Sequence, residues 1–150
     1  MKIVVAFNSL SPKSHSLKEA EGWARERGAE LILTHVSGNE FETLYWDTEG
    51  IGNVAIDQSQ MYEIERAAYE EMQVLLEKEV QRLKKDGILV TGIMTKGDPA
   101  SEIIVQAQEV DADLIIVGCH KREGYQGMIY KSIIEKSDRP VLVVPTIDPD

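Results

Sequence analysis

Five short apolar runs, separated by longer amphipathic stretches, constrain the fold of this chain more than any other feature. The runs cover residues 3–7, 31–36, 88–94, 114–118 and 141–144. Four of them are rich in Ile, Val and Leu without strict alternation, which is typical of strands buried on both faces. The third run is weaker because Thr91 and Gly92 interrupt it. Pro140 precedes the fifth run, and a proline at a strand start indicates the edge of a sheet.

The stretches between these runs have helical periodicity. Helices are predicted at 13–27, 61–85, 99–109 and about 127–137. In the third of them, Asp98 and Pro99 form a typical helix start. Strands that alternate with helices predict βαβ units with right-handed crossovers. The fold class is therefore α/β, an open, doubly wound sheet of five parallel strands with about four helices on its two faces.

One irregular stretch, at about 37–60, interrupts this pattern. It contains three glycines and three large aromatic residues: Gly38, Gly50, Gly52, Phe41, Tyr45 and Trp46. Irregular segments of this length in compact domains are usually functional. Two interpretations stay open: a surface excursion whose aromatic rings cover the end of the sheet, or a lid or partner-binding segment. The length of 150 residues otherwise predicts a single domain over 1–150.

The charge balance narrows the classes of partner. The chain has 26 acidic and 16 basic residues, a formal net charge of -10. Such a surface repels nucleic-acid backbones and anionic membranes, so neither is expected as a partner. No apolar run approaches the ~20 residues that span a bilayer, and the first residues lack the features of a signal peptide. The single cysteine, Cys119, fits a reducing compartment. We expect a cytoplasmic protein.

The order of the elements predicts where a ligand would bind. In an open parallel sheet, ligands bind at the carboxyl ends of the strands where the winding reverses. That point falls between the end of the first strand, at Asn8, and the end of the fourth, at 118–122. A glycine-bearing loop before a helix exposes backbone N–H groups to anions. Lys121 and Arg122 add two cations, which makes phosphate binding chemically plausible, although a basic pair on an exposed loop is more often simply solvated.

Catalytic and metal-binding patterns are weak. His15, His35 and His120 lack the spacing of metal ligands. Cys119 is adjacent to His120, but neighbouring residues on a strand end point apart, and no third group orients them. The sequence therefore predicts no metal site and no catalytic residues.

Several blocks of the sequence resemble the universal stress protein family over nearly the whole chain. They are residues 97–99, 103–104 with Ala107, 112–118 and the closing 139–145, while 2–9 and 31–36 fit the family's first two strands. The resemblance implies the strand order 3-2-1-4-5. It also implies a homodimer built on the last strand, from Val141 to Val144, whose edge would otherwise be unpaired.

The family's ATP-binding members carry a loop after the fourth strand of the form Gly-x-x-Gly, nine residues, Gly and then Ser or Thr. Here Gly118 matches the first glycine, but Lys121 occupies the second. Without gaps, the last pair falls on Lys131 and Ser132, which leaves too few residues for the last helix. Alignment backward from Pro140 places that pair on 127–128 instead. We prefer this register, in which the loop is about four residues shorter, because helix length is more constrained than loop length.

The resemblance and its departures define the functional expectation. Asn8 replaces the Asp that ATP binders usually carry, and Lys121 prevents the close backbone approach that glycine gives. We expect a non-enzymatic, dimeric stress-response or signalling domain without standard ATP binding, with no certain cofactor and an unidentified protein partner. The alternative is a sensor of ATP, AMP or another adenine nucleotide, in which Val36 packs on the base; slow ATP hydrolysis is more remote. The nucleotide site would comprise Asn8, Val36, Gly118, His120, Lys121, Arg122 and Gly127.

Overall fold

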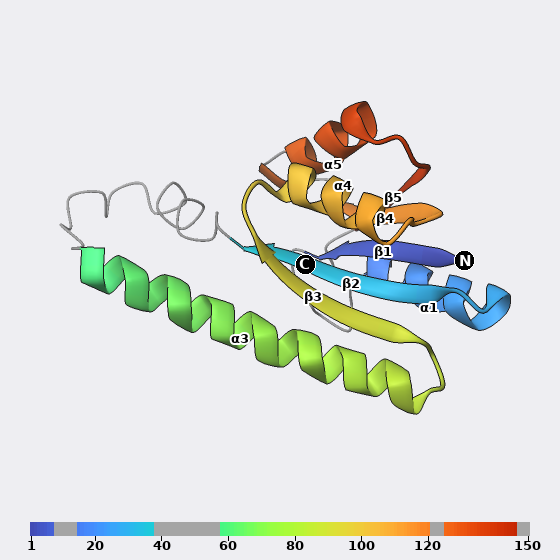
Figure 1. Ribbon diagram of the computed structural model, residues 1–150, viewed down its shortest axis with the longest axis horizontal. Helices are drawn as coiled ribbons and strands as arrows, with labels where there is room; N and C mark the ends of the chain where they lie inside the picture. Colours follow the sequence, from blue (N-terminus) through green and yellow to red (C-terminus); the bar gives the residue numbers. More distant parts are fainter. Residues whose placement is uncertain (8–14, 38–57, 121–124, 147–150) are drawn as a thin grey trace.

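The computed structural model describes residues 1–7, 15–37, 58–120 and 125–146 of the chain. Its elements, in order, are β1 (Lys2–Phe7), α1 (His15–Arg27), β2 (Glu30–Ser37), α3 (Gln58–Lys85), β3 (Val90–Lys96), α4 (Pro99–Glu109), β4 (Leu114–His120), α5 (Tyr125–Lys136) and β5 (Val141–Thr146). The five strands form one sheet in the order β3-β2-β1-β4-β5 (Figure 1). The predicted fold class and strand order are confirmed.

The sheet is parallel throughout, and β1 lies at its centre. Val4 of β1 is aligned with Ile32 of β2 on one side and with Ile115 of β4 on the other. The chain builds the sheet from β1 outward to β3 and then crosses back to β4. The winding therefore reverses between β1 and β4, as the sequence predicted, and β5 is an edge strand as Pro140 indicated.

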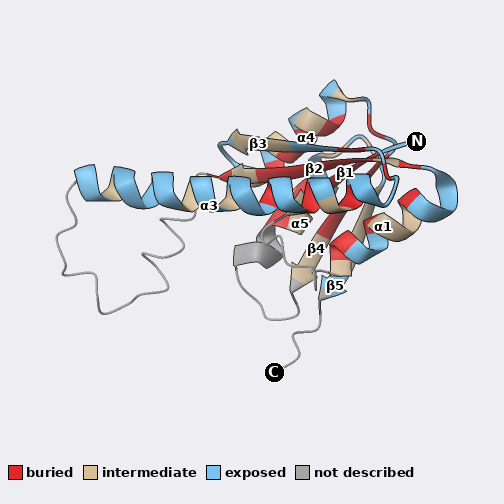
Figure 2. Ribbon diagram, turned by 90° about the horizontal axis from the view of Figure 1, so that it is seen from below, coloured by how far each residue is buried: buried red, intermediate tan, exposed pale blue. Residues whose placement is uncertain are grey.

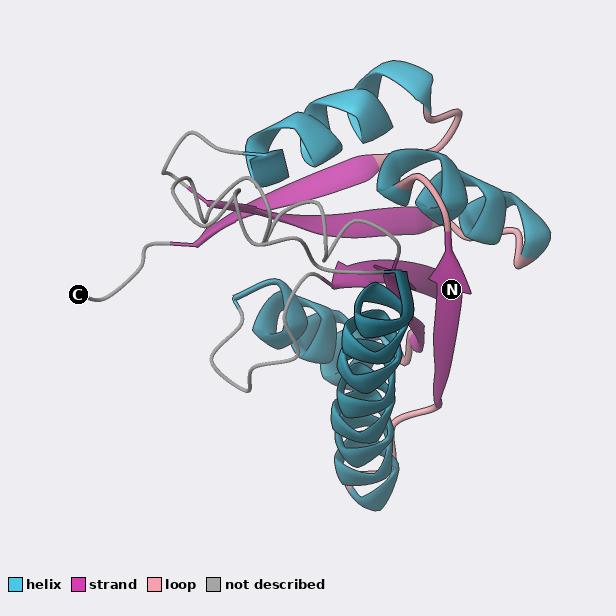
Figure 3. Cartoon of the chain, turned by 90° about the vertical axis from the view of Figure 1, so that its left-hand side faces the viewer, coloured by secondary structure: helices cyan, strands magenta, loops and turns pink. Residues whose placement is uncertain are grey.

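Helices cover both faces of the sheet (Figure 3). One core cluster joins α1 and α3 to alternate strand residues such as Ile3 and Ile116. The second cluster joins α4 and α5 to the intervening residues, such as Val4 and Ile115. Because successive side chains of a strand point to opposite faces, burial on both sides requires continuous apolar runs. This arrangement explains why these runs do not alternate.

The structure corrects several predicted boundaries. The third strand does not begin at Ile88, because this residue lies in the preceding turn, where its backbone N–H donates to the carbonyl of Leu83 at 3.1 Å. Ile88 is apolar because it is buried against the core, not because it is in a strand. The irregular segment is shorter than 37–60: Ser37 still belongs to β2, and α3 already begins at Gln58. The remainder, 38–57, lies outside the described residues. The fourth helix begins at Tyr125, two residues earlier than predicted.

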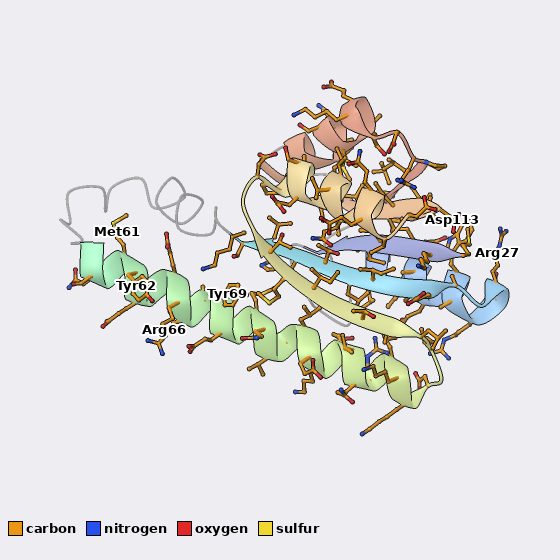
Figure 4. The ribbon with its side chains drawn as sticks, viewed as in Figure 1. Arg27, Met61, Tyr62, Arg66, Tyr69 and Asp113 are labelled. Atoms are coloured by element: carbon orange, nitrogen blue, oxygen red, sulfur yellow. The ribbon has the colours of Figure 1, made fainter. Side chains whose placement is uncertain are left out.

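Helix α3 is much longer than the strands on which it packs. Its 28 residues extend about 42 Å, whereas the seven residues of β3 extend about 23 Å. Among the side chains of α3 whose burial is described, the buried ones all lie in its second half: Leu76, Glu79, Val80 and Leu83. The first half projects beyond the sheet and is largely exposed (Figure 2). Met61, Tyr62, Arg66 and Tyr69 extend from this projecting part (Figure 4).

A network of charged side chains connects α3 to α1. The guanidinium of Arg82 lies 2.8 Å from Glu79 and 2.7 Å from Glu21. Burial lowers the pKa of Arg82, but hydrogen bonds to Glu79 and Glu21 outweigh this effect and raise it above its ordinary value. The buried Glu79 is thereby compensated, as a charge inside a protein must be.

None of the helices in the described part of the chain combines the length and apolar character needed to cross a bilayer.

Candidate functional site

The candidate site lies at the carboxyl edge of the sheet, where β1 ends at Phe7 and β4 ends at His120. The first turn of α1 approaches the same edge. A Cβ atom at Gly118 would lie 3.6 Å from the hydroxyl of Ser16, which is ordinary contact distance. The imidazole Nδ1 of His15 lies 3.4 Å from the carbonyl oxygen of Pro145. The edge is therefore formed jointly by the strand ends and the start of α1.

The structure places only some of the predicted site residues. Val36 is half-buried in β2 and packs on the face covered by α4 and α5. Gly118 lies on the opposite face, because it follows Ile116 at the strand period of two. The two residues thus reach the same edge from different sides of the sheet. Gly127 lies in the first turn of α5.

The other predicted residues lie wholly or partly outside the described part of the chain. His120 ends β4 and is aligned with Thr146, but its side chain lies outside the described residues. Asn8, Lys121 and Arg122 also lie outside the described residues. Their participation in a site stays a prediction.

The connection between β4 and α5 is short. Only residues 121–124 separate the end of β4 at His120 from the start of α5 at Tyr125. Lys131 and Ser132 are the seventh and eighth residues of α5, so the ungapped register would place the motif's last pair in mid-helix. Gly127 lies at the start of that helix, where helix N–H groups face outward. These bounds favour the register with the shortened loop.

Residues 97–99, the glycine-aspartate-proline block that carries much of the family resemblance, form the turn and the helix cap between β3 and α4. Gly97 has φ 137°, where a side chain is strained, and a Cβ there would lie 3.2 Å from Glu102. The carboxylate of Asp98 caps α4 by accepting hydrogen bonds from the backbone N–H and hydroxyl of Ser101, at 3.0 and 2.8 Å. These bonds lower the pKa of Asp98 below its ordinary value. The block therefore fixes the turn from β3 into α4.

Sequence reasoning missed two buried hydroxyl groups near Val36. Thr95 of β3 is directly opposite Val36 in the sheet, and Thr34 lies two residues earlier in β2. The hydroxyl oxygens of both threonines are buried and have no hydrogen-bond partner among the described residues. Buried polar groups are normally paired, so an unpaired one is a candidate contact for a ligand. A sequence signal existed only for Thr34, which lies inside the apolar run 31–36, whereas Thr95 follows the run 88–94.

The described part of the edge contains no cluster of metal ligands. Within the ranges that the structure describes, no three His, Cys, Asp or Glu side chains are grouped so that they could hold a metal ion. Cys119 is half-buried in β4. The described part of the edge can offer hydroxyls, backbone groups and an apolar surface, which are the means of binding a neutral ring.

Comparisons with known proteins place the chain in a family. The family described as "Universal stress protein family" matches residues 1–145. Universal stress protein YxiE of Bacillus subtilis is 29% identical over 147 residues, 95% of this chain and 97% of the relative. Universal stress protein MJ0577 of Methanocaldococcus jannaschii is 27% identical over 139 residues, 86% of this chain and 85% of the relative.

A solved structure has the same fold. The universal stress protein from Archaeoglobus fulgidus, in complex with dAMP, matches with a TM-score of 0.63 at 23% identity, covering 96% of this chain and 97% of that one. The family match extends over nearly the whole chain and agrees with the observed strand order. The chain belongs to the universal stress protein family.

Proposed function

We propose that this protein is a non-enzymatic stress-response signalling domain, which acts as a dimer through protein contacts and does not bind ATP in the family's standard way. One observation carries the proposal: only four residues separate β4 from α5. A triphosphate needs several backbone N–H groups and cations around it, and a longer glycine-rich loop provides them. A four-residue connection offers fewer such groups.

The residues of that connection support the same conclusion. Lys121 replaces the glycine that would allow close backbone approach, and Met128 replaces the hydroxyl of the ATP-binding motif. Asn8 replaces the aspartate expected near the adenine, which changes the hydrogen-bond pattern offered to the base. The carboxylate at the end of β3, Asp98, is already committed to capping α4. Phosphoryl transfer to water depends on positioned metal ligands and a base, and the proposal assigns neither role to a residue of this edge.

Titration calorimetry tests the ATP claim. The purified protein is titrated with ATP, ADP, AMP and cyclic AMP, and thermal melting is measured in parallel. A ligand that binds the folded state raises its stability, so thermal melting reports binding. Because we propose that ATP does not bind in the standard way, we expect no saturable heat and no melting shift with ATP at millimolar concentration. Micromolar ATP binding would contradict the proposal, and release of phosphate from ATP would contradict its non-enzymatic part.

The dimer is proposed to form through β5. This strand lies at the edge of the sheet, and Val141, Leu142, Val143 and Val144 are each only half-buried. An apolar edge strand with unpaired backbone groups favours pairing with another strand. Sedimentation at tens of micromolar should show a dimer or a larger assembly. A persistent monomer would contradict this contact.

A second candidate function is a sensor of adenine mononucleotides. The Archaeoglobus fulgidus relative was solved in complex with dAMP, a ligand with one phosphate. A single phosphate needs fewer backbone N–H groups and cations around it than a triphosphate does, and a short loop offers few such groups. The base would pack on Val36 near the hydroxyl of Thr95, and the phosphate would meet backbone N–H groups after Gly118.

The role of Lys121 separates this candidate from the first. Lys121→Ala should weaken AMP several-fold and leave adenosine unchanged, because a lysine acts on phosphate as a point charge. Lys131→Ala is the matched control, since Lys131 is exposed on α5. Equal losses for AMP and adenosine would argue against a phosphate contact. Absence of any AMP binding would remove the sensor function altogether.

A further inference from the structure

Helix α3 carries a second apolar stripe, separate from the one that joins the core. Eight large hydrophobic side chains are exposed among the described residues, and three of them share one side of α3, whereas Tyr62 lies on another side of the same helix. Val74 is 67% exposed, Ile64 41% and Leu75 37%. Together with neighbours at helical spacing they form the outer stripe: Ile64, Ala67, Ala68, Glu71, Val74, Leu75 and Lys78.

The outer stripe cannot be an extension of the core. Leu76, Val80 and Leu83 define the buried face of α3. At about 100° per residue, the centre of the outer stripe lies roughly 150° around the helix from that face. Figure 2 shows exposed residues along α3 on the side that turns away from the sheet. A helix with apolar residues on two faces is expected to have a contact on both.

The charges along α3 are divided between its two halves. Residues 58–71 contain four Glu and one Arg, a net charge of -3, whereas 72–85 contain four basic residues and two Glu, a net charge of +2. Two copies of this helix in antiparallel orientation would place each acidic half beside a basic half. The helix is thus complementary to itself under a two-fold axis, which is the symmetry of most homodimers.

Two charged residues of the outer stripe are available for such a contact. Neither Glu71 nor Lys78 forms an ion pair with any other described residue, and both are exposed. Their neighbours differ, since Arg66 pairs with Glu70 and Arg82 pairs with Glu79. The unpaired residues flank Val74 and Leu75 at equal distances in sequence, three residues before the first and three after the second.

We propose that the outer stripe of α3 is an interface with a second copy of this chain. The two helices pair antiparallel about an axis between Val74 and Leu75, so that Val74 contacts the partner's Leu75 at the centre. Glu71 then faces the partner's Lys78 on each side of the axis. Apolar residues at the centre with opposite charges beside them are the usual arrangement of paired helices.

This interface differs from the one expected at β5. Helix α3 packs on β2 and β3, and β3 forms the edge of the sheet opposite to β5. The two contacts can therefore coexist in one assembly. When both contacts form with perpendicular two-fold axes, the closed assembly is a tetramer, and loss of the α3 contact leaves a dimer. When only the α3 contact forms, its loss leaves a monomer.

A charge-exchange experiment tests the pairing. Glu71→Lys and Lys78→Glu are made singly and together, and the mass of the full-length protein is measured by sedimentation at tens of micromolar in low salt. Each single change creates two like-charge contacts across the axis and should raise the dissociation constant at least tenfold, so that the average mass at a fixed protein concentration falls toward half. The double variant restores opposite charges and should return to the wild-type mass.

Matched controls carry the same charge changes elsewhere. Glu109→Lys on α4 and Lys131→Glu on α5 alter exposed residues and should leave the mass unchanged. Circular dichroism confirms that each variant is folded. Single variants that behave like these controls would overturn the proposal, and so would a double variant that fails to reassociate. It would also be overturned if wild type stays at its smaller mass while the stripe binds a different protein.

Discussion

The sheet has an amino edge, where its strands begin, and a carboxyl edge, where they end. These two edges differ in the length of the connections between strands and helices. At the amino edge the connections 28–29, 86–89, 110–113 and 137–140 contain two to four residues, and all of them are described. At the carboxyl edge the connections 8–14, 38–57, 97–98 and 121–124 range from two to twenty residues, and the first, second and fourth lie outside the described residues. Only the turn at 97–98 is short and described there. In open parallel sheets the carboxyl edge is the one that binds ligands.

Polar groups at the amino edge are used to hold the strands together. The backbone N–H of Asp113 donates to the carbonyl of Lys2 at 2.8 Å, and its carboxylate accepts from the backbone N–H of Lys2 at 2.8 Å. Arg139 donates from Nη1 to the carbonyl of Ala112 at 2.8 Å and to the carboxylate of Asp111 at 3.0 Å. These bonds link the starts of β1, β4 and β5.

Polar groups near the carboxyl edge are used differently. The hydroxyls of Thr34 and Thr95 are buried without a hydrogen-bond partner among the described residues. An unpaired buried hydroxyl costs stability, so a fold optimised for stability alone would exclude it. Arg139 Nε at the amino edge also lacks a hydrogen-bond partner among the described residues, so the contrast lies in the side-chain bonds that join the strand starts and not in the presence of unpaired groups alone.

The largest expected effect is at the amino edge. Arg139→Ala removes charge-assisted hydrogen bonds from a side chain that is only 19% exposed. The free energy of unfolding should fall by about 2 kcal/mol. Denaturant unfolding measures this change, with Lys84→Ala on the exposed face of α3 as a control that should change it little. If Arg139→Ala lowered the free energy of unfolding as little as Lys84→Ala does, the proposed difference between the two edges would be wrong.

A smaller effect is expected at the one turn of the carboxyl edge that resembles the amino edge. Asp98→Ala removes the cap of α4 and should cost about 1 kcal/mol, whereas Asp98→Asn keeps an acceptor and should cost less. Because the pKa of Asp98 is lowered in the folded state, its contribution is fully present above about pH 4 and is lost as the pH falls through the lowered value. Unfolding curves of wild type and Asp98→Ala should converge in acid. A constant gap at every pH would show that the charge does not contribute.

The smallest expected effect has the opposite sign. Thr34→Val replaces the unpaired hydroxyl with a methyl group of similar shape. The free energy of unfolding should stay equal or rise by up to about 1 kcal/mol, because the buried group no longer lacks a partner. Ser37→Ala is the comparison, since the hydroxyl of Ser37 donates to the carbonyl of Thr95 at 3.4 Å. Destabilisation by Thr34→Val would show that its hydroxyl is satisfied in solution.

The sequence predicted the fold well for identifiable physical reasons. The apolar runs of β1, β2 and β4 are buried on both faces, and short continuous runs of this kind are typical of strands inside a parallel sheet. Pro99 and Asp98 predicted the correct start of α4 because proline and a capping carboxylate act locally. Ile88 misled the prediction because a buried turn residue and a strand residue are equally apolar. The single-domain organisation, the cytoplasmic location and the partner stay predictions.

The candidate site was less predictable. Strand order located its edge, because the reversal beside β1 follows from topology. Because successive residues of a strand face opposite sides, Val36 and Gly118 lie on opposite faces of the sheet. The predicted nucleotide site had grouped them without this distinction. The unpaired hydroxyls of Thr34 and Thr95 could not be recognised, since hydrogen bonding depends on three-dimensional neighbours. The outer stripe of α3 was not recognised, because helical periodicity over 61–85 predicts a helix without showing which of its apolar residues the sheet covers.

The length and composition of the β4–α5 connection are the central claim, and one paired measurement tests them most directly. ATP dissociation constants are measured for wild type and for a variant with about four residues inserted after Gly124, combined with Lys121→Gly and Met128→Ser, because a longer glycine-bearing loop can direct more N–H groups at phosphate. We predict that the lengthened variant binds ATP at least tenfold more tightly. Equal constants for the two proteins, whether tight or weak, would contradict the account.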